Sequence, residues 1–189
     1  MTRKFNFVLL SLLIFTLLLF PSIVMAGIGS ITKGSGARYF RTKGEKRWVA
    51  AETGKDINEG DRVKTGKDGR MEIHLQDGSK FSIGNNTEME ITRFLLEKDK
   101  RNATVFLAHG KLRAMVAKFL GKTNMKVRTP TAVAGVKGTD FIVLNEGKAN
   151  VFFGNEGNVE VKGKDKEAVP LIPDTMTENT QGHTPIEPV

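Results

Sequence analysis

The chain has 189 residues and no cysteine, which excludes disulfide bonds, thiolate nucleophiles and thiolate metal ligands. It carries 29 Lys and Arg against 21 Asp and Glu, a formal net charge of +8, so it is basic without being extreme. A chain of this length forms one domain of ordinary size, and its apolar core suffices for folding without a metal or cross-links.

The first 26 residues are typical of a secretory signal peptide. A short positive segment precedes an apolar stretch over residues 5–20, and Val24 and Ala26 place small residues at the −3 and −1 positions before Gly27. We therefore predict cleavage between Ala26 and Gly27 and an exported mature protein. The alternative is an inner-membrane anchor formed by residues 5–26, but the strongly apolar core is shorter than the roughly 20 residues of a comfortable membrane span.

The basic residues gather in two stretches, at residues 33–47 and 98–128. Export separates the protein from nucleic acid, so we expect no nucleic-acid partner. Anionic lipid headgroups, acidic envelope polymers or an acidic protein are the partners that such charge can attract. The simpler interpretation is a solvated surface that keeps the domain soluble, and charge alone does not decide between the two.

Short alternating runs separated by turn residues fill the sequence from Gly27 to Gly163. The clearest run is Met71–Leu75, followed by an Asp77-Gly78 turn and a returning run at Phe81–Ile83. Similar runs follow at residues 89–91, 103–108, 111–118, 125–128, 132–136, 140–144, 149–153 and 158–161. The pattern predicts an all-β fold, an antiparallel sandwich or roll of about ten short strands, jelly-roll-like and preceded by a signal-peptide helix.

Two local predictions complete the map of the chain. His109-Gly110 is expected to turn the chain between two strands. Residues 164–189 are charged at first and then contain four of the six prolines. We expect one strand at residues 168–172 and a loosely ordered tail after Pro173, so the domain itself is predicted to span residues 27–163.

Several of these segments together form a recognisable pattern. The residues that carry it are Gly60, Asp61, Thr65, Gly66, Asp77, Gly78, Thr129, Pro130, Gly138, Thr139, Asp140 and Phe141. In order, spacing and content the chain resembles the FecR-type periplasmic domain family from about residue 28 to residue 161. The stretch from Thr129 to Phe141 is the most specific part of the resemblance.

The resemblance implies an all-β extracytoplasmic domain, so we expect the exported mature protein to be periplasmic. Well-known members of the family act in iron-uptake signalling, where the domain hangs from one membrane helix, receives a signal from an outer-membrane transporter and is joined to an anti-sigma segment inside the cell. Only four residues precede the apolar stretch here, too few for such a segment. We therefore expect a stand-alone exported member that does not itself regulate a sigma factor.

The motif residues have a structural interpretation and a functional one. The glycines suit turns, Asp61 and Asp77 can cap turns, and Thr129-Pro130 suits the entry to an edge strand. Asp140 can hold the bend that Gly135 and Gly138 make. The functional alternative is a binding surface on the loop from Gly135 to Asp140.

No pattern in the sequence indicates catalysis or a cofactor. His74, His109 and His183 are scattered, without the paired spacing of a metal site, and His74 is expected on the polar face of its strand. The string from Gly135 to Thr139 has no P-loop lysine, no serine lies in a nucleophile elbow, and the calcium-loop pattern of alternating aspartates is missing. We predict a protein that is not an enzyme and has neither a cofactor nor a metal.

Three functions fit the sequence, in decreasing order of preference. The first is a non-enzymatic binding, sensing or adaptor module that acts through an unidentified envelope protein. The second is a structural envelope protein that binds an anionic polymer or lipid surface through its basic stretches. The third is an unrecognised hydrolase, which the missing site elements disfavour.

Overall fold

The computed structural model describes residues 27–163 and 166–189. The predicted signal peptide and the Ala26 side of its cleavage site therefore lie outside the described residues, and Gly27 is the first residue described. Within these two ranges, no helix is long and apolar enough to cross a membrane. The described chain consists of strands and the turns between them, which confirms the all-β prediction.

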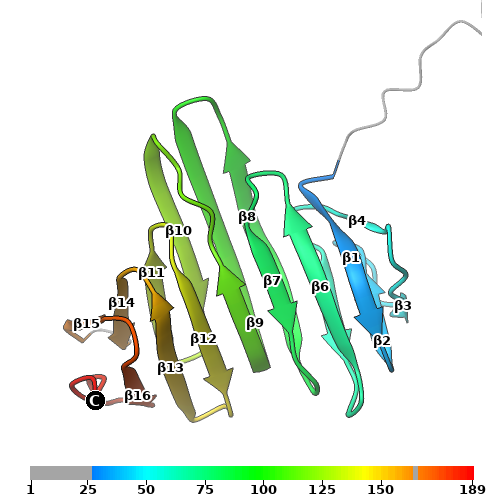
Figure 1. Cartoon of the computed structure of the whole chain (residues 1–189). Coiled ribbons are helices and arrows are strands. Elements are labelled where there is room, and N and C mark those ends of the chain that lie inside the picture. Colours follow the sequence, from blue (N-terminus) through cyan, green and yellow to red (C-terminus); the bar gives the residue numbers. More distant parts are fainter. Residues whose placement is uncertain (1–26, 164–165) are drawn as a thin grey trace, which may run out of the picture.

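The strands form two sheets that share one long strand, β9 (Lys100–Met115) (Figure 1). Sheet A contains, in spatial order, β4 (Asp56–Ile57), β1 (Gly29–Ser35), β6 (Arg70–Leu75), β7 (Lys80–Ile83), the second part of β9, β12 (Asp140–Asn145), β13 (Ala149–Glu156) and β16 (Met176–Thr180). Sheet B contains β3 (Val49–Ala50), β2 (Arg38–Arg41), β5 (Arg62–Thr65), β8 (Glu88–Leu96), the first part of β9, β10 (Lys122–Arg128), β11 (Ala132–Val136), β14 (Val159–Gly163) and β15 (Ala168–Leu171).

Spatial order follows chain order in both sheets, apart from the two-residue strands at one end. The chain adds one or two strands to one sheet, crosses to the other, and so advances from β1 and β2 towards β15 and β16. This arrangement is a roll. It differs from the predicted jelly roll in having sixteen strands in the described ranges and in being mixed, because β9 and β10 pair in parallel.

The prediction of a turn at His109-Gly110 was wrong, because β9 continues through these two residues without reversing its direction. Residues before Gly110 pair with β8 and β10, and residues after it pair with β7 and β12. Gly110 has a φ of 101°. A side chain there would meet Thr87, whose Oγ1 accepts a hydrogen bond from the Lys111 N–H at 2.9 Å. The positive φ therefore redirects a strand from one sheet to the other instead of reversing it.

Alternation along the strands produces a single core between the sheets. In β6, Met71, Ile73 and Leu75 are buried, whereas Glu72 and His74 are only half-buried, as the period of two predicts. The same pattern recurs in β7, β9, β11, β12 and β14. The buried apolar side chains of both sheets, apart from Val169 of β15, belong to one cluster.

The strand predicted at residues 168–172 is present as β15 (Ala168–Leu171), but the loose tail predicted after Pro173 contains a further strand, β16. β15 extends sheet B beside β14, and β16 extends sheet A beside β13. The last residue then pairs with β16, since Met176 and Val189 exchange N–H to O bonds of 2.9 and 3.1 Å. The strand β16 escaped sequence analysis because its inward residues, Thr177 and Asn179, are polar.

Candidate functional site

The first group of motif residues holds together the turns around β5. Asp61 is buried, and its carboxylate accepts the N–H groups of Lys43 at 2.9 Å and Asn58 at 2.8 Å. Gly60, just before it, has a φ of 88°. Asp61 and Gly60 therefore have the capping and turn geometry that the sequence predicted.

Thr65 and Gly66 join the end of β5 to the turn between β7 and β8. The Thr65 hydroxyl donates to the Gly84 carbonyl at 2.6 Å and accepts the Thr87 N–H at 3.0 Å. Gly66 lies so close to Ala37 that a Cβ on it would be 2.9 Å from the Ala37 Cβ. Both residues fasten neighbouring elements together and present no free polar group to a ligand.

Asp77 caps the turn between β6 and β7, where Gly78 has a φ of 84°. Its carboxylate accepts the Ser79 N–H at 3.0 Å and the Ser79 hydroxyl at 2.9 Å. It also accepts the Arg101 Nη1–H at 2.9 Å, and neither charged side chain of this pair is exposed to solvent. Asp77 is therefore both a turn cap and one half of a buried ion pair.

Arg101 is the residue that sequence analysis missed. Its guanidinium also donates to the Ala117 carbonyl at 2.9 Å and to the Thr123 hydroxyl at 3.1 Å, and it lies 5.2 Å from the centre of the Phe119 ring. These contacts fasten the connection between β9 and β10 to the β6–β7 turn. The available signal was position, because Arg101 begins the inward series continued by Ala103 and Val105.

Thr129-Pro130 forms a tight hairpin turn rather than the entry to an edge strand. The strands it joins, β10 and β11, are both interior strands of sheet B. Thr129 donates its N–H to the Ala132 carbonyl at 2.9 Å, and its hydroxyl accepts the Ala132 N–H at 3.0 Å. Proline is tolerated because its missing donor falls in the turn and outside the ladder.

The last motif residues, Gly138 to Phe141, lie at and just before the start of β12, where partly exposed and buried positions alternate. Gly138 has a φ of 65°, Thr139 is buried, and Phe141 is fully buried in the common cluster. Asp140 lies at the bulge between β12 and β13. The loop residues on which the binding alternative rested are thus largely engaged within the fold.

Asp140 links three strands on the outer face of sheet A. Arg113 on β9 donates to it twice, from Nε at 3.0 Å and from Nη2 at 2.6 Å, and Asn155 donates from its amide at 2.6 Å. The hydrogen bonds from Arg113 lower the pKa of the Asp140 carboxyl, and they outweigh the partial burial that raises it. This geometry matches the predicted role of Asp140 in holding a bend.

Replacing Asp140 with asparagine is expected to lower the free energy of unfolding by about 1–2 kcal/mol at pH 7. Because the folded pKa is depressed, the stabilisation by the ionised carboxyl is full above about pH 5 and is lost as the pH falls through the folded pKa. Urea titrations of both proteins at pH 7 and pH 3 measure the difference. The exposed Glu146→Gln variant should stay within about 0.5 kcal/mol of the parent at both pH values. An Asp140→Asn loss that is as large at pH 3 would contradict this account.

Thr139→Val is expected to leave stability unchanged or to raise it by up to about 1 kcal/mol. The Thr139 hydroxyl is buried and has no hydrogen-bond partner among the described atoms, so valine removes an unpaired polar group while keeping the shape. Thermal unfolding of the purified domain measures the effect. Thr65→Val supplies the contrast, because that hydroxyl has partners and its loss should destabilise by about 1–3 kcal/mol.

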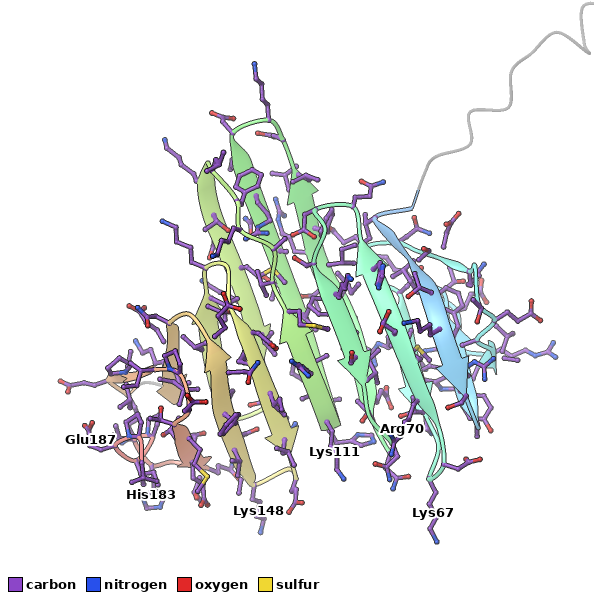
Figure 2. The ribbon with its side chains drawn as sticks, in the orientation of Figure 1. Lys67, Arg70, Lys111, Lys148, His183 and Glu187 are labelled. Atoms are coloured by element: carbon purple, nitrogen blue, oxygen red, sulfur yellow. The ribbon has the colours of Figure 1, made fainter. Side chains whose placement is uncertain are left out.

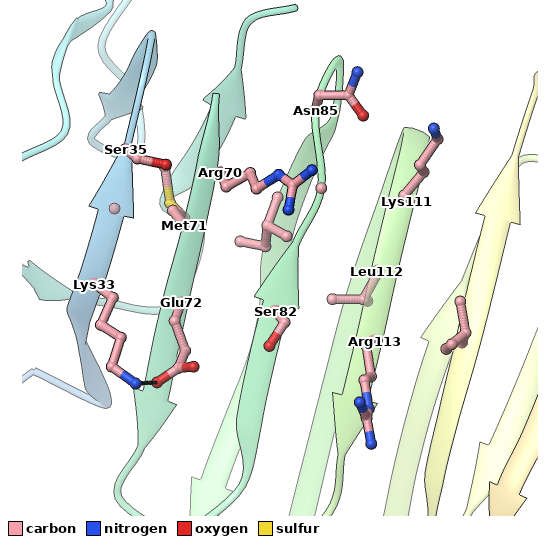
Figure 3. A pocket seen from close by; sticks show the side chains of 14 residues that line it. Lys33, Ser35, Arg70, Met71, Glu72, Ser82, Asn85, Lys111, Leu112 and Arg113 are labelled. Carbon is pink, nitrogen blue, oxygen red and sulfur yellow. Dashed lines mark ion pairs between the residues drawn. The ribbon is translucent and has the colours of Figure 1, made fainter. Parts of the chain in front are cut away.

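A groove of about 640 Å³ crosses five strands of sheet A (Figure 3). Strand pairing places Lys33, Glu72, Ser82, Arg113 and Ile142 in one row across the outer face of β1, β6, β7, β9 and β12. A second row holds Ser35, Arg70, Gly84 and Lys111. The residues between the rows, such as Met71 and Leu112, bury their side chains in the core, so the floor of the groove is mainly backbone.

The walls of the groove are positively charged. Lys33, Arg70, Lys111 and Arg113 line it with a single carboxylate, Glu72. Within the described residues, Lys33 and Arg113 have ion-pair partners, whereas no carboxylate lies within 4.0 Å of the charged nitrogens of Arg70 or Lys111. The groove therefore favours an anionic ligand.

Glu72 is already engaged inside this groove. Partial burial raises its pKa, but the hydrogen bond with His74 at 2.7 Å, the charge of Lys33 at 3.7 Å and the Thr32 hydroxyl outweigh burial and lower it. His74 lies on the half-exposed face of β6, as the sequence predicted.

The basic character continues beyond the groove. Figure 2 shows Lys67, Arg70, Lys111 and Lys148 along one edge of the molecule, at the ends of several strands. All four residues are exposed. In the two described ranges, no three His, Asp or Glu side chains gather as a metal site would require. The absence of catalysis and of a cofactor remains a prediction.

A comparison of the sequence with models of known protein families identifies the family of this chain. The family model described as FecR protein matches residues 61–160, which is more than half of the chain. The chain belongs to the FecR family. The matched part of this FecR protein runs from the start of β5 into β14 and contains all the motif residues quoted above except Gly60.

Two solved structures show a similar fold. Both are crystal structures of a "putative anti-sigma factor" from Parabacteroides distasonis ATCC 8503, at 2.50 and 1.65 Å resolution, with 22% and 21% sequence identity to this chain. Each match has a TM-score of 0.55 and covers 66% of this chain and 57% of the other. The chain thus spans little more than half the length of these proteins, and the likeness concerns the fold. A search of curated proteins finds no match.

Proposed function

We propose that the protein is an exported, non-enzymatic binding or sensing module that acts in the periplasm through a protein partner of the cell envelope. Membership of the FecR family and the fold shared with the anti-sigma-factor structures support a role in signalling. The observation that carries the proposal is the basic groove across sheet A. It offers unpaired cations on a rigid sheet, whereas the motif residues are engaged within the fold.

Photocrosslinking in intact cells tests this function. A photoreactive amino acid replaces Ser82, at the middle of the groove, and the matched control places it at Glu160, on the exposed face of sheet B. We expect one specific protein partner with the Ser82 label and none with the Glu160 label. Failure to recover any specific protein with the label at Ser82 would refute the proposal.

Periplasmic location has its own test. The protein recovered from the periplasmic fraction should begin at Gly27 by N-terminal sequencing. Recovery of the chain in the membrane fraction with Met1 still attached would show an anchored protein instead.

A second candidate function is binding to an anionic polymer or lipid surface. The observation in its favour is a basic and aromatic cluster beside β2 and β3, where Arg41 lies 4.5 Å and Lys64 5.9 Å from the centre of the Trp48 ring. Tyr39 and Val49 nearby are 40% and 46% exposed. Sedimentation with isolated cell wall or anionic vesicles at low and high salt tests this candidate, and absence of binding at low salt rules it out.

A further inference from the structure

The outer face of sheet A carries an apolar strip directly beside the basic groove. Strand pairing aligns Ile142 on β12 with Phe153 on β13 and Met176 on β16, and aligns Leu144 with Val151 in the next row. Met176 is 47% exposed, and the other four are half-buried. Apolar side chains therefore continue the first row as far as Met176 on β16 and the second row as far as Val151 on β13, which is followed by the exposed Glu178 on β16.

We propose that the groove and this strip together form one docking surface for an extended segment of a protein partner, acidic in one half and apolar in the other. This inference rests on the proposed function and adds the chemistry of the partner. Arg70 and Lys111 attract the acidic half, and Phe153 and Met176 receive the apolar half. Cations without ion-pair partners and an adjoining apolar strip complement such a segment, whereas a purely anionic polymer leaves the strip uncovered.

The dimensions of the sheet set the length of the segment. The surface crosses β1, β6, β7, β9, β12, β13 and β16, and neighbouring strands lie about 4.8 Å apart, so its span is about 29 Å. An extended chain rises about 3.3 Å per residue, which gives a segment of about nine residues. The segment lies across the strands, so side-chain contacts rather than added strand pairing bind it.

Peptide binding tests the chemistry directly. The probe is a fluorescein-labelled nonapeptide with four acidic residues, a central glycine and four residues drawn from Leu, Val and Phe, made in both directions. Three comparison probes are a peptide with lysine in place of the acids, a peptide with serine in place of the apolar residues, and vesicles containing phosphatidylglycerol. Fluorescence anisotropy at two salt concentrations gives the affinity of the peptides, and sedimentation gives that of the vesicles.

We expect the full probe to bind more tightly than all three comparison probes, and more weakly at high salt. Arg70→Glu with Lys111→Glu should weaken its binding by tenfold or more, since the change replaces two attractive charges in the groove with two repulsive ones. The matched control, Lys126→Glu with Lys162→Glu, makes the same change of charge at exposed positions of sheet B and should weaken binding less than about threefold. Phe153→Ala should weaken the full probe and leave the serine-containing probe unaffected.

Three results would overturn the inference. One is no binding of the full probe, and another is equal loss of binding in the sheet A and sheet B charge variants. The third is equal binding of the serine-containing probe or of the vesicles, which would point to a general anionic surface. The outcome is separable from that of the proposed function: a protein crosslinked at Ser82 without peptide binding leaves the function standing and refutes this chemistry. Peptide binding without any protein crosslinked at Ser82 supports the binding chemistry of the surface and refutes the proposed function.

Discussion

Arg101→Met is expected to lower the free energy of unfolding by about 3–5 kcal/mol, among the largest effects of any single change in this protein. The change removes the cation from a pair whose two side chains are fully buried and leaves the Asp77 carboxylate without its counter-charge. Methionine keeps most of the apolar stem of the arginine, so the loss reports the ion pair and its hydrogen bonds more than a cavity. Urea unfolding followed by circular dichroism measures it.

Two further variants separate the ion pair from other effects. Lys100→Met, on the same strand but exposed, should change stability by no more than about 0.5 kcal/mol. The double variant Arg101→Met with Asp77→Asn should lose at least 1 kcal/mol less than the sum of the two single losses, because the second change removes the uncompensated charge. An Arg101→Met loss as small as that of Lys100→Met, or strictly additive losses, would show that the pair contributes little.

Phe141→Ala is expected to lower the free energy of unfolding by about 3–5 kcal/mol, through lost burial and the cavity left behind. Phe141 has no exposed surface and packs in the cluster shared by both sheets. The matched control is its neighbour Ile142→Ala, on the outer face of the same strand, which should lose less than about 1.5 kcal/mol. Similar losses at the two positions, measured by the same urea titration, would contradict the assignment of Phe141 to the core.

The strands from β6 to β14 could largely be predicted from the sequence because a one-sided strand has a period of two, whereas β1 to β5 were not predicted. Met71, Ile73 and Leu75 alternate with polar residues and are the residues found buried. Glycine at positive φ was also predicted correctly at Gly60 and Gly78, because each follows a strand or a turn residue. Local pattern and local conformation were enough in these cases.

Predictions failed where distant contacts decide the outcome. A glycine with positive φ marks a turn at Gly78 but a change of sheet at Gly110, and only the pairing on both sides distinguishes them. β16 has the polar inward residues Thr177 and Asn179, so its pairing with β13 carried no hydrophobic signal.

The candidate site could not be predicted from the sequence either, because contacts between distant parts of the chain form it. Lys33, Arg70 and Lys111 come from three strands that meet only after the roll has formed, and the sequence placed two of them in separate basic stretches. Arg101 was assigned to the solvated surface because charge usually indicates exposure. Its inward position and its partner Asp77 become visible only in the folded chain.

The advance of the chain along the roll has a consequence for how such a domain changes in evolution. The family match begins at Asp61 and ends at Glu160, so β1–β4 lie beyond one end of the matched part and β15 and β16 beyond the other. In each sheet these outer strands pair with the common middle only through its first and last strands, while Ile31, Phe40 and Leu171 add side chains to the common core. Strands at either end can therefore be exchanged without breaking any pairing within the shared middle, provided that their inward side chains still cover the ends of the core.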